Sequence, residues 1–198
     1  MDTRIGKSIF LLFFFSGFAA LVYQIAWQRS LFTLLGSNTE STTIIVTVFM
    51  LGLGCGALAG GWLSHACAGR LPTVFALLEA VTGIYGFASL AIIKGVAAFD
   101  MTTQAVTVLL AMAVLLPPTL LMGASLPLLT AYLNRRYANA GRSVAALYLC
   151  NTLGAAGASF LTVWVLFPHL GLSGTVYGAG TLNLVVGAAA FFLLRRRG

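Results

Sequence analysis

Six apolar stretches, each long enough to cross a lipid bilayer as a helix, constrain this chain more than any other feature. A membrane-spanning helix needs about 20 residues. Apolar residues make up 60% of the sequence and charged residues only 8%, whereas soluble domains carry about 25% charged residues. We therefore expect an all-α integral membrane protein, a bundle of six transmembrane helices that forms a single domain over residues 1–198. The expected spans are approximately 8–28, 42–64, 72–94, 103–132, 143–167 and 171–194.

The positions of Lys and Arg predict the orientation of this bundle. Nine of the eleven basic residues fall on one side of the expected spans, and Arg29 and Lys94 fall on the other. Cytoplasmic loops carry the excess of basic residues, so we predict that both termini are cytoplasmic. The predicted location is the inner (cytoplasmic) membrane of a bacterial-type cell, as a multi-pass protein. Because the net charge of +7 sits in short gaps between apolar runs, it indicates a lipid bilayer as the partner and no nucleic acid.

The Cys and His residues predict no metal site. Cys55, Cys67 and Cys150 form no CxxC or Cys/His spacing, and His65 and His169 are expected at opposite faces of the membrane. Cysteines in apolar segments usually pack as small apolar residues. We predict neither a metal nor a cofactor.

Glycine, with 22 residues, predicts how the helices pack. Small residues let membrane helices approach closely. We predict helix packing at Gly52, Gly56 and Gly60 of the second span and at Gly154 and Gly178 of the fifth and sixth. Because the second and fifth spans are similar in composition, a 3+3 inverted repeat resembling half a major-facilitator transporter is a further interpretation.

The fourth span contains Pro117, Pro118 and Pro127, which predict a kink or an interruption. Proline removes a backbone donor and crowds the preceding turn of the helix. In lipid, the carbonyl groups that lose their partners must be satisfied by neighbouring protein or by a cavity.

Glu79 is the one carboxylate well inside an expected span. An unpaired charge at such a depth costs about 3 kcal/mol on insertion scales. Glu79 is therefore either a proton or cation site, or a neutral carboxyl that ties helices together through Asn151 or Thr82. Asn151 is expected at the same depth in the fifth span.

A compact polar and aromatic group lies near the end of the first span: Tyr23, Gln24, Trp27, Gln28 and Arg29. Aromatic residues at this depth usually anchor a helix at the membrane interface. The alternative is an outward vestibule whose rings and amides hold an organic cation. Both interpretations fit the sequence.

Six ordered motifs resemble the membrane module of the membrane-bound spermidine synthase-like proteins, also called fused major-facilitator/spermidine synthase proteins. Together they cover nearly the whole chain between Ser16 and Thr175. The motifs are SGFAALVYQIAWQR (16–29), FMLGLGCGALAGGWLS (49–64), LLEAVTGIYG (77–86), PPTLLMGASLPLL (117–129), GRSVAALYLCNTLGAAGASF (141–160) and PHLGLSGT (168–175).

The resemblance implies functional roles for a set of polar and aromatic residues. In longer members of this family, the module precedes a soluble aminopropyltransferase-like domain with a Rossmann-type core, which binds a decarboxylated S-adenosylmethionine-type donor. Because the sequence ends at Gly198 and has no glycine loop after a strand, we expect that the chain is not itself an enzyme, although it could belong to an enzyme complex. The residues implied by the resemblance are Tyr23, Gln24, Trp27, Arg29, Glu79 and Asn151.

Three functions fit these observations. The first is a binding or transport-like module for a small organic cation such as a polyamine. The second is a structural or assembly subunit of a larger membrane complex, and the third is a membrane anchor for a separate aminopropyltransferase-like enzyme. Six helices supply half of a twelve-helix transporter, so we expect a homo-oligomer, other membrane subunits or a soluble transferase as partners. We predict no catalytic residue, and the predicted substrate-binding residues are Glu79, Asn151, Tyr23, Gln24, Trp27, Gln28 and Arg29.

Overall fold

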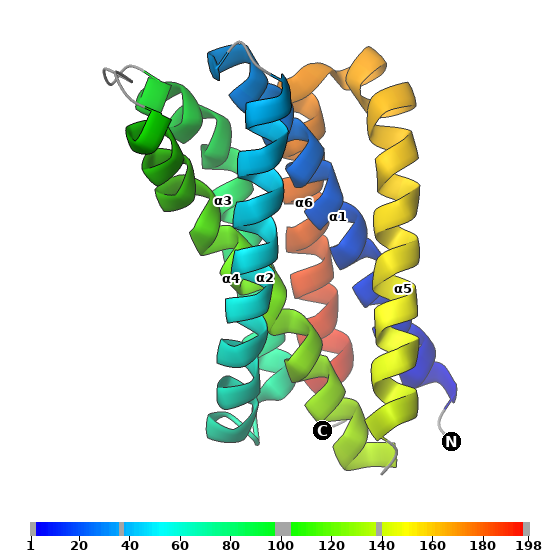
Figure 1. Ribbon diagram of the computed structural model, residues 1–198. Helices are drawn as coiled ribbons and strands as arrows, with labels where there is room; N and C mark the ends of the chain where they lie inside the picture. Colours follow the sequence, from blue (N-terminus) through cyan, green and yellow to red (C-terminus); the bar gives the residue numbers. More distant parts are fainter. Residues whose placement is uncertain (1–2, 36–37, 98–103, 138–139, 196–198) are drawn as a thin grey trace.

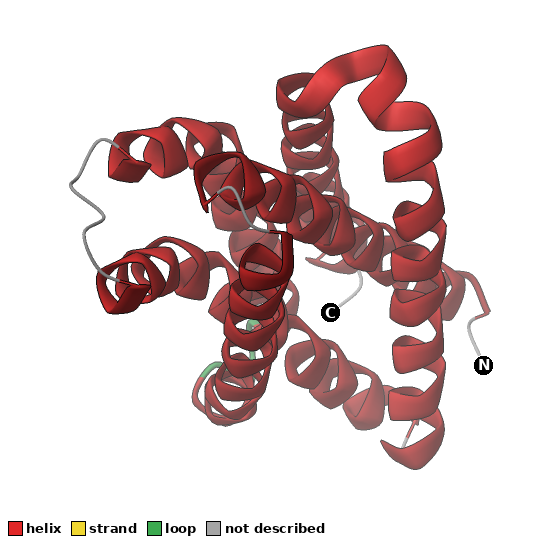
Figure 2. Ribbon diagram, turned by 45° about the horizontal axis from the view of Figure 1, so that its top comes forward, coloured by secondary structure: helices red, strands yellow, loops and turns green. Residues whose placement is uncertain are grey.

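The computed structural model describes residues 3–35, 38–97, 104–137 and 140–195, and these residues are helical apart from a short turn at 67–70. The prediction of an all-helical fold is confirmed for this described part of the chain, which contains no strand. Figure 2 shows the helices gathered into one bundle. The elements are α1 (Thr3–Leu35), α2 (Asn38–Ala66), α3 (Leu71–Ala97), α4 (Gln104–Tyr137), α5 (Ala140–Leu161), the π-helical turn η1 (Thr162–Leu166) and α6 (Phe167–Arg195).

Five helical stretches of the described residues are long and apolar enough to cross a membrane. The first four coincide with the first four expected spans to within a few residues. The fifth stretch covers both of the last two expected spans, because the helix continues from α5 through η1 into α6. The stretches are Ser8–Thr33, Thr39–Ala66, Leu71–Val96, Val108–Arg135 and Gly141–Leu194.

The fifth stretch changes direction near Gly171. This residue has φ 65° and ψ −177°, and it interrupts the helical backbone inside α6. A positive φ of this kind is readily adopted by glycine and rarely by residues with a side chain. In Figure 1 the chain turns back here, so that α5 (yellow) and the main part of α6 (orange to red) run in opposite directions.

Three helix pairs make the most extensive contacts in the bundle. α2 packs on α4, α3 packs on α6, and α1 packs on α5. Smaller contacts join α3 to α4, α1 to α6, α1 to α2 and α4 to α5. Each of the first three helices therefore has its main partner among the last three.

The stripe of Gly52, Gly56 and Gly60 on α2 faces α4. A Cβ added at any of these three positions would collide with atoms of α4. The approach is reciprocal, since a Cβ at Gly123 of α4 would collide with the backbone of Leu53 on α2. Small residues on both sides therefore let the two helix backbones touch.

Gly154 and Gly178 differ in their surroundings. A Cβ at Gly154 of α5 would collide with the carbonyl oxygen of Phe14 on α1. Gly178 of α6 is exposed, and nothing lies within 4 Å of the place its Cβ would take. The prediction that Gly178 packs is wrong: α6 approaches α3 through Gly180, which lies opposite Gly83. Gly178 and Gly180 are two residues apart and so lie on different faces of the helix. The spacing of glycines in the sequence did not show which of the two faces is buried.

α4 continues as one helix through Pro117, Pro118 and Pro127, so the prolines do not interrupt it. Pro118 cannot donate to the carbonyl oxygen of Val114, four residues earlier. The hydroxyl of Tyr85 on α3 donates to this oxygen. A neighbouring helix thus satisfies the carbonyl group that the proline leaves without its usual partner.

Two apolar clusters fill the interior, one toward each end of the bundle. One contains Tyr23, Trp27 and Phe49, and the other contains Phe13 and Phe75, each with several aliphatic side chains. Between them, on α1, α3 and α6, lies a small group of buried polar side chains.

Candidate binding site around Glu79

Glu79 lies on α3 and is held by donors from two other helices. Its side chain is 3% exposed. The Ser16 hydroxyl of α1 donates to Glu79 Oε1 at 2.6 Å, and the Asn183 amide Nδ2 of α6 donates to Glu79 Oε2 at 2.6 Å. The carboxyl group therefore ties three helices together, through Ser16 and Asn183 rather than through the predicted Asn151 or Thr82.

The charge of Glu79 has no buried counterpart in the described part of the chain, where no Lys, Arg or His side chain is buried. An enclosed carboxylate without a partner is strongly unfavourable. Two polar atoms nearby also have no hydrogen-bond partner among the described residues, Asn183 Oδ1 and the Tyr23 hydroxyl. The group as a whole is thus rich in oxygen atoms and short of positive charge, which is suited to holding a proton or a cation.

Glycines make room for this polar group. A Cβ at Gly86 of α3 would collide with the hydroxyl and the ring of Tyr23. A Cβ at Gly187 of α6 would lie 2.8 Å from the carbonyl oxygen of Ala76 and 3.3 Å from Glu79 Cβ. Small residues on α3 and α6 therefore allow the Tyr23 and Glu79 side chains to fit between the helices.

Tyr23 and Trp27 are fully buried inside the bundle. Their rings stack at a centroid distance of 5.0 Å, and Trp27 Nε1 donates to Ser89 Oγ on α3 at 3.0 Å. A residue that anchors a helix at the membrane interface would have an exposed polar end. Of the two interpretations of these rings, neither the interface anchor nor the open vestibule matches this position, and their observed contacts join α1 to α3.

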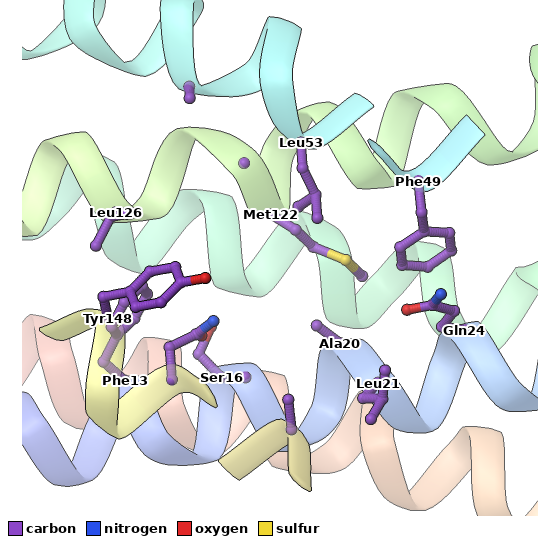
Figure 3. Close-up of a pocket in the computed structure, with 15 residues that line it drawn as sticks. Phe13, Ser16, Ala20, Leu21, Gln24, Phe49, Leu53, Met122, Leu126 and Tyr148 are labelled. Carbon is purple, nitrogen blue, oxygen red and sulfur yellow. The ribbon is translucent and has the colours of Figure 1, made fainter. Parts of the chain in front are cut away.

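A cavity of about 290 Å³ lies between α1, α2, α4 and α5. In Figure 3, Ser16 and Tyr148 lie toward one end and Gln24 and Phe49 toward the other, with Met122 reaching in between. Most of its surface is apolar. The lining residues are Phe13, Ser16, Gly17, Ala20, Leu21, Gln24, Phe49, Leu53, Ala57, Met122, Gly123, Leu126, Tyr148, Asn151 and Ala155.

Ser16 connects this cavity to Glu79. The side chain lines the cavity, and its hydroxyl donates to the Glu79 carboxylate on α3. Gln24 and Asn151 also line the cavity, so the structure brings these two predicted residues to one place. Glu79 is not among the lining residues, and within the described part of the chain its hydrogen-bonded connection to the cavity is Ser16. The sequence analysis missed the roles of Ser16 and Asn183; a polar side chain within an apolar run was the available signal.

Gln28 and Arg29 face away from that cavity. Gln28 Nε2 donates to Thr42 Oγ1 on α2 at 2.7 Å, and the Arg29 guanidinium lies over the ring of Phe167, 5.1 Å from its centroid. Both residues line a second, more open cavity of about 710 Å³. The five residues predicted as one group on α1 are therefore divided among the interior, the first cavity and the second cavity.

Among the described residues, no three His, Cys, Asp or Glu side chains come together as metal ligands would. The cysteines Cys55, Cys67 and Cys150 are free thiols, and Cys55 is exposed.

Comparison with known proteins finds relatives that carry the name of an enzyme. The chain is 34% identical over 181 residues to the polyamine aminopropyltransferase of Mycobacterium tuberculosis, covering 88% of this chain and 34% of that protein. It is 26% identical over 197 residues to polyamine aminopropyltransferase 1 of Streptomyces coelicolor, covering 98% of this chain and 36% of that protein. It is 25% identical over 191 residues to polyamine aminopropyltransferase 2 of Aquifex aeolicus, covering 96% of this chain and 36% of that protein. No protein-family model matches the chain, and no solved structure matches it significantly.

These relatives correct one expectation. We predicted that the chain is not an enzyme, yet the homologues at up to 34% identity over 88% of the chain are named polyamine aminopropyltransferase. The prediction relied on the end of the sequence at Gly198. The chain spans about a third of the length of the curated relatives it matches, so that end is no argument against enzymatic activity.

Proposed function

We propose that this chain is the membrane-embedded helical region of a polyamine aminopropyltransferase, a spermidine synthase-like protein, and that it binds a polyamine cation in the cavity between α1, α2, α4 and α5. The observation that carries this proposal is the hydrogen bond from Ser16, at the cavity wall, to the buried Glu79. The names of the relatives support a polyamine as the ligand.

The charge of Glu79 favours a cation over a neutral or anionic ligand. A ligand ammonium group at the cavity wall donates to Ser16 Oγ, and Ser16 donates to Glu79 Oε1, so the carboxylate stabilises the ammonium through one hydroxyl. Such chains of hydrogen bonds strengthen one another in a medium of low dielectric constant. The same arrangement offers the carboxylate the positive partner that the described residues do not supply.

The shape of the cavity favours a linear polyamine. Ser16 and Gln24 are eight residues apart on α1, which corresponds to about 12 Å along a helix. The wall between them is mostly apolar and includes Leu21 and Met122. A polyamine has the matching pattern, because amine groups at a distance from each other are joined by methylene chains that prefer an apolar surface.

Binding of spermidine to the purified chain tests this proposal. We expect calorimetric titration in mild detergent to show binding that weakens about tenfold or more in Glu79→Gln, because hydrogen bonds to a charged group contribute about 1.5–3 kcal/mol. Glu40→Gln is the matched control, since it removes the same charge from an exposed carboxylate. Equal affinity in the wild type and Glu79→Gln, with both proteins folded, contradicts the proposal.

We further propose that α5 and α6 are separate spans, giving six in all, and that the two sets of three helices form an inverted repeat. Exchanging α1 with α4, α2 with α5 and α3 with α6 turns the pair α2–α4 into α5–α1 and leaves α3–α6 unchanged. The three most extensive pairings are therefore related by one exchange, and so are the smaller ones, α3–α4 with α6–α1 and α1–α2 with α4–α5.

The glycine contacts support this repeat at the level of single residues. A Cβ at Gly56 of α2 would collide with the carbonyl oxygen of Leu120, and a Cβ at Gly123 of α4 with that of Leu53. In each case the oxygen belongs to the residue three positions before the opposite glycine.

The pair formed by α1 and α5 has the same pattern. A Cβ at Gly154 would collide with the carbonyl oxygen of Phe14, and a Cβ at Gly17 with that of Asn151. These oxygens again belong to the residues three positions before Gly17 and Gly154. The matching register of the two pairs is what duplication of a three-helix unit would produce, and it supports the proposed repeat.

A second candidate function is structural, namely to anchor an aminopropyltransferase in the membrane, packed against other subunits or a second copy. Many large apolar side chains of the described part are exposed, among them Leu58, Trp62 and Phe160. Lipid or a partner covers such side chains. If spermidine does not bind, this is the function that remains.

A further inference from the structure

The second cavity differs in chemistry from the first. It lies where the end of α1 meets α5, η1 and the start of α6, and one cationic side chain, Arg29, faces it. A cation such as a polyamine would be repelled here. The lining residues are Ile25, Gln28, Arg29, Phe32, Thr33, Ser159, Val163 and Phe167.

Arg29 is positioned but not neutralised. Its guanidinium lies over the ring of Phe167, and none of the described residues that line the cavity carries a carboxylate. Among the described residues, no hydrogen bond or ion pair reaches this guanidinium. A guanidinium that rests on an aromatic face keeps the N–H groups along its edge available for a bidentate anion.

The remaining polar groups of the cavity add a donor. The Thr33 hydroxyl donates to the carbonyl oxygen of Arg29, and the Gln28 amide donates to Thr42, so these two donors are in use. The Ser159 hydroxyl on α5 has no hydrogen bond within the described part of the chain and faces the same space.

The rest of the wall is apolar. Ile25, Phe32, Val163 and Phe167 surround the polar groups. A small hydrated anion gains nothing from these side chains, whereas an anionic group attached to a hydrocarbon chain gains from burying that chain against them.

We propose that this cavity binds a phosphate group through Arg29 and Ser159, and that a phospholipid headgroup supplies the phosphate. Arg29 contributes the charge and the paired N–H donors, Phe167 holds the guanidinium in place, and the apolar wall receives the upper part of an acyl chain. The site is separate from the polyamine cavity and does not depend on its function. Only the lipid source of the phosphate rests on the membrane placement proposed above.

Titration of the purified chain with phosphatidylglycerol in mild detergent, followed by native mass spectrometry, tests this site. We expect a bound lipid whose affinity falls about tenfold in Arg29→Gln. Arg29→Lys keeps the charge but not the planar fork, so its affinity should be intermediate. Lys94→Gln is the matched control, because it removes the same charge from an exposed residue on α3 that is predicted on the same side of the membrane.

A second arm adds inorganic phosphate to the lipid-bound protein. Displacement of the lipid at comparable concentrations identifies free phosphate as the ligand, and retention of the lipid identifies the headgroup; both support a phosphate site at Arg29. Equal lipid retention by the wild type, Arg29→Gln and Lys94→Gln overturns the proposal. So does an equal loss in the two Gln variants, because charge alone would then explain it.

Discussion

Ser16 occupies the position on which the proposed coupling between the cavity and Glu79 depends. Among the described residues, its hydroxyl is the hydrogen-bonded link between the cavity wall and the carboxylate, while Asn183 donates to the other carboxylate oxygen. A serine here gives α1 a side chain short enough to leave the cavity open. Glu79 itself is enclosed, so in the proposal its hydrogen-bonded contact with a ligand in the cavity is made through this residue.

Replacing Ser16 by alanine should therefore lower both the stability of the protein and its affinity for spermidine. The buried Glu79 Oε1 loses its hydrogen-bond donor, which should lower the free energy of unfolding by about 1–3 kcal/mol. Thermal unfolding in detergent and calorimetric titration measure the two effects. Ser64→Ala is the control, because Ser64 is also buried but its hydroxyl donates to Gly61 of its own helix. Spermidine affinity that is equal in Ser16→Ala and Ser64→Ala would show that Ser16 plays no part in binding.

The sequence predicts the enclosure of Glu79 but not its partners. Counting residues along a span gives depth, and it placed Glu79 and Asn151 at a common level. It does not give the direction in which a side chain points or the order of helices around the bundle. Asn151 approaches α1 at Gly17, while Asn183, which has the matching amide on α6, reaches Glu79. Only the packing of α3 on α6 decides between the two amides.

At the scale of the elements, the contact between α2 and α4 depends on the absence of side chains. Gly56→Ala should destabilise the protein by about 1–3 kcal/mol, because the new methyl group collides with backbone atoms of α4, which cannot move aside. Gly54→Ala on the same helix is the control, since nothing lies within 4 Å of its Cβ position. There the gain in helix propensity leaves stability unchanged or raises it by up to about 1 kcal/mol. Thermal unfolding should therefore occur at a lower temperature in Gly56→Ala than in Gly54→Ala, and equal shifts would contradict the close contact.

The change of direction inside α6 depends on the backbone of Gly171. Gly171→Ala should lower the free energy of unfolding by about 1–2 kcal/mol. A residue with a Cβ disfavours a positive φ even where the surrounding space is open. Gly178→Ala, seven residues later on the same helix and equally open, should be close to neutral. Thermal unfolding measures the difference. If the two variants unfold alike, the positive φ at Gly171 is wrong.

The sequence predicts α1 to α4 well and the end of the chain less well. Long apolar runs separated by basic residues marked the first four helices, since polar gaps there interrupt the pattern. Between the last two expected spans the gap is only Pro168 and His169 with their neighbours. Proline is tolerated in the first turn of a helix, so helical structure continues through η1 and the change of direction falls at Gly171 instead. The hydropathy pattern of the sequence does not predict the π-helical turn at Thr162–Leu166.

At the scale of the whole molecule, the number of spans decides on which sides of the membrane the two termini lie. Six spans put both termini on one side, which the basic residues predict to be the cytoplasm. If Gly141–Leu194 made one crossing, the five spans would put the termini on opposite sides. A green fluorescent protein and an alkaline phosphatase reporter, each fused in turn to either end, measure this. We expect fluorescence without phosphatase activity at both ends; phosphatase activity at one end would contradict six spans.

The pairing of the helices also bears on how the molecule is assembled during synthesis. The main partners of α1, α2 and α3 are α5, α4 and α6. When the first half of the chain leaves the ribosome, the helix faces with the most extensive contacts are therefore still uncovered. They are covered only once the second half is made, so neither half produced alone can complete the fold. Severing the polypeptide between α3 and α4 and producing both pieces in one cell should restore an interlocked molecule, whereas each piece by itself should be degraded.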